Sequence, residues 1–159
     1  MMNREILFKA KRKDNGKWVE GYYIYHIKRT ICPLGDSVKP EDEQHVIMQD
    51  GFSDWNMPRN TVVYEIDPDI LCQYTGLTDK NGQRIWENDI ITISAYSYYE
   101  PEDCYTGIVF YSEYYASWCL KDINHDCMIL PICDCLGSYT TEINYIGNIF
   151  DNADLLEVE

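Results

Sequence analysis

Residues 71–91 constrain the fold more than any other stretch of this chain. An apolar segment runs from Leu71 to Leu77, a polar loop follows at Thr78–Gly82, and Ile85 starts a second apolar segment. The loop ends in Asn-Gly, and both residues tolerate the positive φ angles that a tight reversal requires. The stretch therefore predicts two strands joined by a β-turn.

The rest of the chain repeats this alternation of short apolar or β-branched segments with turn residues. No segment keeps a helical period of 3.6 over three turns. Asp14-Asn15-Gly16 predicts the turn of an N-terminal β-hairpin. Strands are predicted at residues 4–13, 17–27, 45–48, 61–66, 89–94, 107–112, 115–122, 127–134 and 143–150, and a short helix at residues 152–158 with Asn152 as its cap.

These elements predict a mainly β fold with little helix. Residues 1–80 form a β-rich region that contains the hairpin and a loop-rich insertion at about residues 29–60, where Pro and Gly interrupt any regular period. Residues 81–159 are expected to form a small β-barrel that a final strand closes and a short C-terminal helix follows. The boundary is placed near Lys80, and a single continuous unit is the alternative.

Charge is distributed unevenly over the 159 residues, whose formal net charge is −14. Residues 81–159 contain two Lys or Arg against fourteen Asp or Glu, whereas residues 1–29 contain eight against three. So acidic a chain repels phosphate backbones, which argues against direct nucleic-acid binding. The acidic half is either a solvated face or a surface that attracts a basic partner.

The seven cysteines form an odd set, and no secretory signal precedes them. The expected compartment is the reducing cytoplasm, where thiols stay free. No window approaches the ~18 uninterrupted apolar residues of a membrane span, so no membrane association is predicted.

Cysteines also supply the one cluster that resembles a metal site, together with His125. If residues 127–134 form a strand, the thiols of Cys133 and Cys135 share one face, and that face can equally be core. Buried thiols are the preferred interpretation, so no metal ligand, cofactor or catalytic residue is predicted. Zinc binding and redox chemistry stay open as alternatives, and the cysteines concerned are Cys119, Cys127, Cys133 and Cys135.

Three motifs together resemble the YopX family of phage and prophage proteins. The first is Tyr74-Thr-Gly-Leu followed by Asp79-Lys-Asn-Gly, Trp86 and Asp89-Ile. The second is the opening Arg4-Glu-Ile-Leu-Phe-Lys-Ala, in which Lys9 stands where arginine is usual. The third is the closing Tyr145-Ile-Gly-Asn-Ile-Phe-Asp-Asn. Gly107-Ile-Val matches the Gly-x-Val strand of the family, whereas residues 31–60 and 96–105 match nothing.

The resemblance implies small barrels of the Src-homology-3 (SH3) type and carries over no catalytic residue. Its residues are therefore interpreted structurally. Glycines supply turn geometry or close backbone approach, and the carboxylates of Asp79 and Asp89 accept hydrogen bonds from turn amides. The predicted structural signature consists of Tyr74, Gly76, Asp79, Gly82, Trp86, Asp89, Gly147 and Asn148.

These observations predict a non-catalytic accessory protein of a phage or prophage that binds a protein partner or assembles with itself. Exposed sheet edges and tyrosine-rich acidic loops both favour protein contact. One alternative is an acidic mimic of nucleic acid that occupies a DNA-binding protein of the bacterial host. The other is a metal-dependent enzyme that uses His125 and the cysteines.

Overall fold

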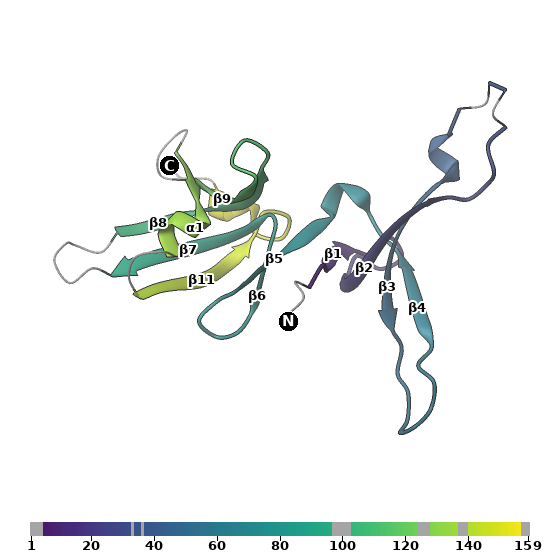
Figure 1. Cartoon of the computed structure of the whole chain (residues 1–159), viewed down its shortest axis with the longest axis horizontal. Coiled ribbons are helices and arrows are strands. Elements are labelled where there is room, and N and C mark those ends of the chain that lie inside the picture. Colours follow the sequence, from purple (N-terminus) through teal and green to yellow (C-terminus); the bar gives the residue numbers. More distant parts are fainter. Residues whose placement is uncertain are drawn as a thin grey trace. The chain divides into compact units, whose positions relative to one another are not determined.

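The computed structural model describes residues 5–32, 34–35, 37–96, 103–123, 128–136 and 140–156. It confirms a mainly β chain built of antiparallel strands (Figure 1). Its internal contacts divide it into two compact units, residues 5–73 and residues 74–159. We call these the first unit and the second unit, and each has its own hydrophobic core.

The first unit is an antiparallel sheet in the order β4-β3-β2-β1, to which the first residues of β5 are added. Its strands are β1 (Phe8–Lys11), β2 (Trp18–Ile27), β3 (Glu43–Asp50) and β4 (Thr61–Glu65), and two short 3-10 helices are η1 (Pro40–Asp42) and η2 (Pro68–Ile70). Gly16 has a φ of +68°, which suits the predicted turn between β1 and β2. The core consists of Ala10, Val19, Ile47 and Ile66.

The second unit contains the rest of β5 (Cys72–Thr78), its partner β6 (Arg84–Trp86) and a five-stranded sheet in the order β10-β9-β8-β7-β11. The sheet strands are β7 (Asp89–Tyr96), β8 (Asp103–Ser112), β9 (Ser117–Asp122), β10 (Ile129–Pro131) and β11 (Thr140–Asn148). Helix α1 (Ile132–Leu136) lies between β10 and β11, and the 3-10 helix η3 (Ala153–Leu156) follows β11. The core consists of Ile85, Ile91, Ile93, Val109, Leu120, Ile132 and Ile143.

The closed SH3-like barrel that we expected is not confirmed. Within the described residues the five-stranded sheet is open, with β10 at one edge and β11 at the other. Its apolar face is covered by other elements instead, since Ile132 of α1 and Ile85 of β6 belong to the core and Leu77 of β5 packs against it. A covered face needs no closure of the sheet upon itself.

Three predicted elements differ from the structure. The strand predicted at residues 127–134 is confirmed only at β10, because α1 begins at Ile132. The strand predicted at residues 45–48 of the loop-rich insertion is confirmed but is longer, since β3 has eight residues and pairs with both β2 and β4. The final helix is a 3-10 turn of four residues, and the Asn152 side chain accepts a hydrogen bond from the Asn148 backbone amide at 3.2 Å.

Candidate functional site

Asp79 organises the turn between β5 and β6. One carboxylate oxygen accepts the backbone N–H groups of Asn81 and Gln83, each at 2.8 Å, and the other accepts the Asn81 side-chain amide at 3.2 Å. Burial alone would raise the pKa of Asp79, but these hydrogen bonds favour the charged form and hold the pKa below its usual value. Gly82 completes the turn with a φ of +83°. The Asp79 carboxylate therefore holds the backbone of this turn in place.

Asp89 lies at the start of β7 and is fully buried. It accepts hydrogen bonds from the Trp86 backbone N–H at 2.8 Å and from the Asn148 side-chain amide at 2.9 Å. The Asn148 side-chain oxygen in turn accepts the Phe150 backbone N–H at 3.0 Å. This network joins the start of β7 to the end of β11, two segments far apart in the sequence.

The remaining signature residues also hold strands and turns. The rings of Tyr74 and Trp86 pack against each other with centroids 5.3 Å apart. Gly76 has a φ of +89°, a conformation that side-chain-bearing residues rarely adopt. Gly147 follows an irregularity in the β7–β11 pairing, and a Cβ there would lie 2.7 Å from the side-chain oxygen of Asn152.

The cysteine cluster does not form the predicted arrangement. Cys133 and Cys135 lie on α1, where positions two apart point in different directions, so Cys133 is exposed and Cys135 is half-buried. Cys119 is buried in β9, and burial raises the pKa of the Cys135 thiol, helped by Asp134 and Cys133. The described residues contain no group of three metal-ligating side chains, and both Cys127 and His125 lie outside them.

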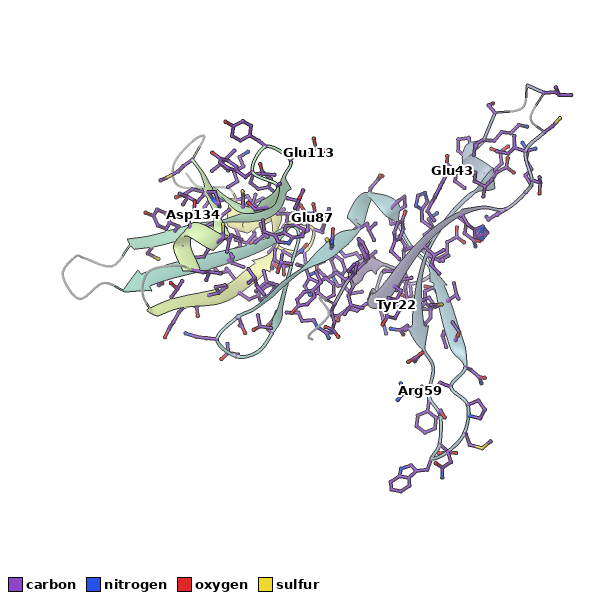
Figure 2. The ribbon with its side chains drawn as sticks, viewed as in Figure 1. Tyr22, Glu43, Arg59, Glu87, Glu113 and Asp134 are labelled. Carbon is purple, nitrogen blue, oxygen red and sulfur yellow. The ribbon has the colours of Figure 1, made fainter. Side chains whose placement is uncertain are left out.

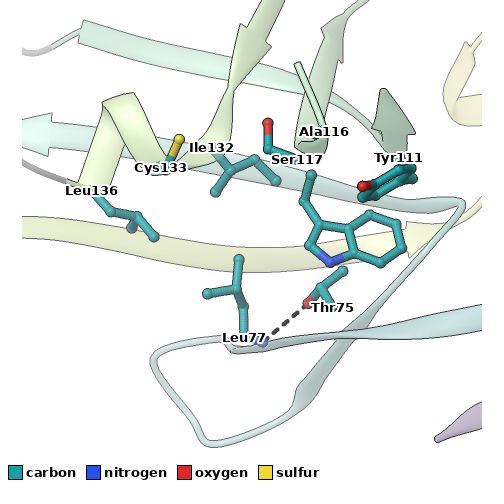
Figure 3. Close-up of a pocket in the computed structure, with 9 residues that line it drawn as sticks. Thr75, Leu77, Tyr111, Ala116, Ser117, Ile132, Cys133 and Leu136 are labelled. Carbon is teal, nitrogen blue, oxygen red and sulfur yellow. Dashed lines mark hydrogen bonds between the residues drawn. The ribbon is translucent and has the colours of Figure 1, made fainter. Parts of the chain in front are cut away.

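An apolar pocket of about 240 Å³ opens on the second unit (Figure 3). Ile132 and Leu136 of α1 line one side of it and Leu77 of β5 lines another. Residues from the β8–β9 hairpin complete the wall, including Trp118, whose buried indole nitrogen has no hydrogen-bond partner within the described chain. No local sequence pattern indicates this pocket, because its lining comes from β5, the β8–β9 hairpin and α1.

A second, more polar hollow of about 370 Å³ shares Leu77 and Leu136 with the apolar pocket. Lys80 and Glu142 line it, and their charged groups lie 4.0 Å apart with about half of each side chain exposed. Two adjoining hollows thus form one surface with an apolar part and a charged part. Such a surface is suited to bind an apolar side chain that has charged neighbours.

The first unit exposes apolar side chains at the turn between β3 and β4. We call residues 51–60 the hairpin tip; Figure 2 shows Arg59 on this segment. Phe52, Trp55 and Met57 are 90%, 96% and 64% exposed. Most surface residues of soluble proteins that are this exposed are polar, and clustered exposed aromatic and Met side chains mark interaction sites.

A row of apolar side chains also crosses the sheet of the first unit. Tyr22, Met48 and Val63 are directly paired across β2, β3 and β4, so they share one face. Tyr22 and Val63 are each more than half exposed. The sequence showed the alternation of these strands but not which face lacks a covering layer.

The family model described as YopX protein matches residues 7–157, almost the whole chain. The chain belongs to the YopX family. No curated protein matches it.

A solved structure that this YopX-family chain resembles is the crystal structure of protein EF1440 from Enterococcus faecalis. The two share 20% sequence identity with a TM-score of 0.44, over 98% of this chain and 100% of the other. In the described part of this YopX-family chain, no helix has the length and apolar character needed to cross a bilayer.

Proposed function

We propose that this YopX-family chain is a non-catalytic binding module, encoded by a phage or prophage, that recognises a protein through the first unit. One observation carries the proposal: Trp55 is 96% exposed at the hairpin tip, between the exposed side chains of Phe52 and Met57. Trp and other aromatic residues dominate the energetics of protein interfaces. An isolated chain that keeps such side chains in water has a binding surface available.

Several hydrogen bonds and an ion pair hold the conformation of the hairpin tip, which supports its role in recognition. Its base is closed by a backbone hydrogen bond from Gly51 to Asn60 at 2.6 Å and by the Asp50–Arg59 ion pair at 3.0 Å. Within it, the Ser53 hydroxyl donates to the Met57 carbonyl at 2.8 Å. A turn held at several points presents its aromatic side chains with little ordering cost on binding.

Affinity capture with matched variants tests this proposal. Tagged wild type, Trp55→Ser and Leu34→Ser are compared, since Leu34 is 94% exposed and lies outside the hairpin tip. We expect Trp55→Ser to lose the partners that wild type and Leu34→Ser retain. Equal recovery of every partner by all three proteins would contradict the proposal.

A second candidate function rests on charge. Residues 81–159 contain fourteen acidic and two basic residues, a balance that can imitate the phosphate charge of nucleic acid and occupy a host DNA-binding protein. Binding of this kind weakens steeply as salt rises, because the contacts are between exposed charges. Capture at low and high salt separates the candidates: aromatic anchoring persists in high salt, whereas charge mimicry does not.

A further inference from the structure

We infer that the hairpin tip of one copy inserts Trp55 into the apolar pocket of a second copy. This inference rests on the proposed binding function and names its partner as the same chain. Both halves of the contact are present in one sequence: an aromatic side chain that is 96% exposed and an apolar pocket that no side chain of the described structure fills.

The dimensions of the pocket fit an aromatic ring system. An engineered cavity of about 150 Å³ binds benzene, and the pocket here is about 240 Å³. An indole is larger than benzene by one fused ring, so it matches the larger volume. Leu77, Ile132 and Leu136 offer the apolar contacts that its faces need.

The two surfaces also carry one pair of opposite charges that can meet. Asp54 directly precedes Trp55 and is exposed on the hairpin tip. Lys80 lines the hollow that adjoins the pocket, half of its side chain is exposed, and its ammonium group lies 4.0 Å from the Glu142 carboxylate, with which Asp54 would share it. With the indole in the pocket, the neighbouring carboxylate is placed to approach this ammonium group, which fixes the orientation of the tip.

The contact joins two different surfaces, so it is head-to-tail. Each copy donates one tip and accepts another, and repetition gives a closed ring or an open filament according to the rotation between neighbours. An assembly of this type has a diagnostic property. A copy without a working tip and a copy without a working pocket form a single contact with each other and stop at a dimer.

Sedimentation velocity of the full chain at micromolar concentration tests the inference. The tip variant is Trp55→Ser, with Leu34→Ser as its control. The pocket variant is Leu136→Glu, with Met128→Glu as its control. Leu136 and Met128 are 38% and 37% exposed, and only Leu136 lines the pocket. We expect oligomers for wild type and both controls. Each site variant is expected at the 18.7 kDa monomer mass, with association weakened at least about 30-fold, the loss typical of an interface hot spot.

An equimolar mixture of the tip and pocket variants gives the decisive result. We expect a dimer and nothing larger. A mixture that stays monomeric, or single variants that assemble like wild type, would overturn the inference. If circular dichroism shows that Leu136→Glu is unfolded, Cys133→Phe replaces it, since Cys133 is exposed and lines the same pocket.

Two further outcomes separate this inference from the proposed function. A monomeric wild type that still captures another protein through Trp55 overturns self-insertion and leaves the binding proposal intact. Shielding of Trp55 from a soluble fluorescence quencher in a monomer, independent of concentration, overturns insertion between copies, because the tip then occupies the pocket of its own chain.

Discussion

At the residue scale, the lowered pKa of Asp79 makes the β5–β6 turn sensitive to acid. A group whose pKa is lower in the folded state adds stability above its unfolded pKa, about 3.9 for Asp, and loses it as pH falls through the folded value. We expect Asp79→Asn to lower the free energy of unfolding at pH 7. The deficit relative to wild type should shrink below about pH 4, as measured by urea denaturation across pH.

The control for Asp79 is Glu113→Gln, which neutralises an exposed acid in the turn between β8 and β9 (Figure 2). Its unfolding free energy should follow that of wild type at neutral pH. A deficit in Asp79→Asn that stays constant from pH 7 to pH 3 would show that charge on this carboxylate does not stabilise the turn.

Asp89 and Asn148 should behave as a coupled pair. Asp89→Ala leaves the buried Trp86 amide and the Asn148 side-chain amide without this acceptor, and we expect a loss of about 3 kcal/mol of unfolding free energy. Adding Asn148→Ala to that variant should cost less than Asn148→Ala costs wild type. A double-mutant cycle in denaturant measures the difference, and strict additivity would refute the coupling.

At the element scale, the β8–β9 pairing depends on Gly107. A Cβ at this position would lie 2.2 Å from the Lys121 carbonyl oxygen and 2.8 Å from the Leu120 side chain, so β9 would have to move. We expect Gly107→Ala to lower the unfolding free energy by about 2 kcal/mol. Thermal unfolding measures it, with Ala116→Gly as a comparison because Ala116 has a φ of +49° and should gain stability from glycine.

Strand positions could be predicted from sequence wherever alternation and turn chemistry agree. Trp18–Ile27 and Thr61–Glu65 match the predicted strands to within a residue or two, since β-branched and aromatic residues there are bounded by Asn-Gly or Asp-Pro. The turn at Asp79–Gly82 could also be predicted, from its Asn-Gly pair. In these segments local preference and tertiary pairing favour the same conformation.

Segments whose conformation depends on distant contacts could not be predicted. The strand predicted at residues 127–134 includes the start of α1, where Ile132 packs into a core whose other members lie on β6, β7, β8, β9 and β11. The apolar pocket likewise gathers residues from β5, the β8–β9 hairpin and α1, and no local pattern marks them. The exposure of Trp55 could not be predicted from the sequence either, because the hydrophobicity of a residue does not determine what covers its side chain.

At the scale of the whole molecule, two separate cores predict two separable unfolding events. Ile47 belongs to the core of the first unit and Ile93 to that of the second, and both are fully buried. Truncating either to Ala should cost its own unit about 3 kcal/mol, through lost burial and the cavity left behind. Hydrogen exchange followed by mass spectrometry reads both units in one sample. We expect Ile47→Ala to speed exchange in residues 5–73 and leave residues 84–156 protected.

Strand β5 is what makes this result informative, because it starts in the first unit and ends in the second. If β5 couples the units, Ile47→Ala and Ile93→Ala each speed exchange throughout the chain, and unfolding is a single transition. If each core is sufficient for its own sheet, the effects stay local and Ile93→Ala mirrors Ile47→Ala in residues 84–156. We expect the local outcome, since β5 pairs with β1 only at Cys72 and Gln73 and with β6 from Tyr74 onward.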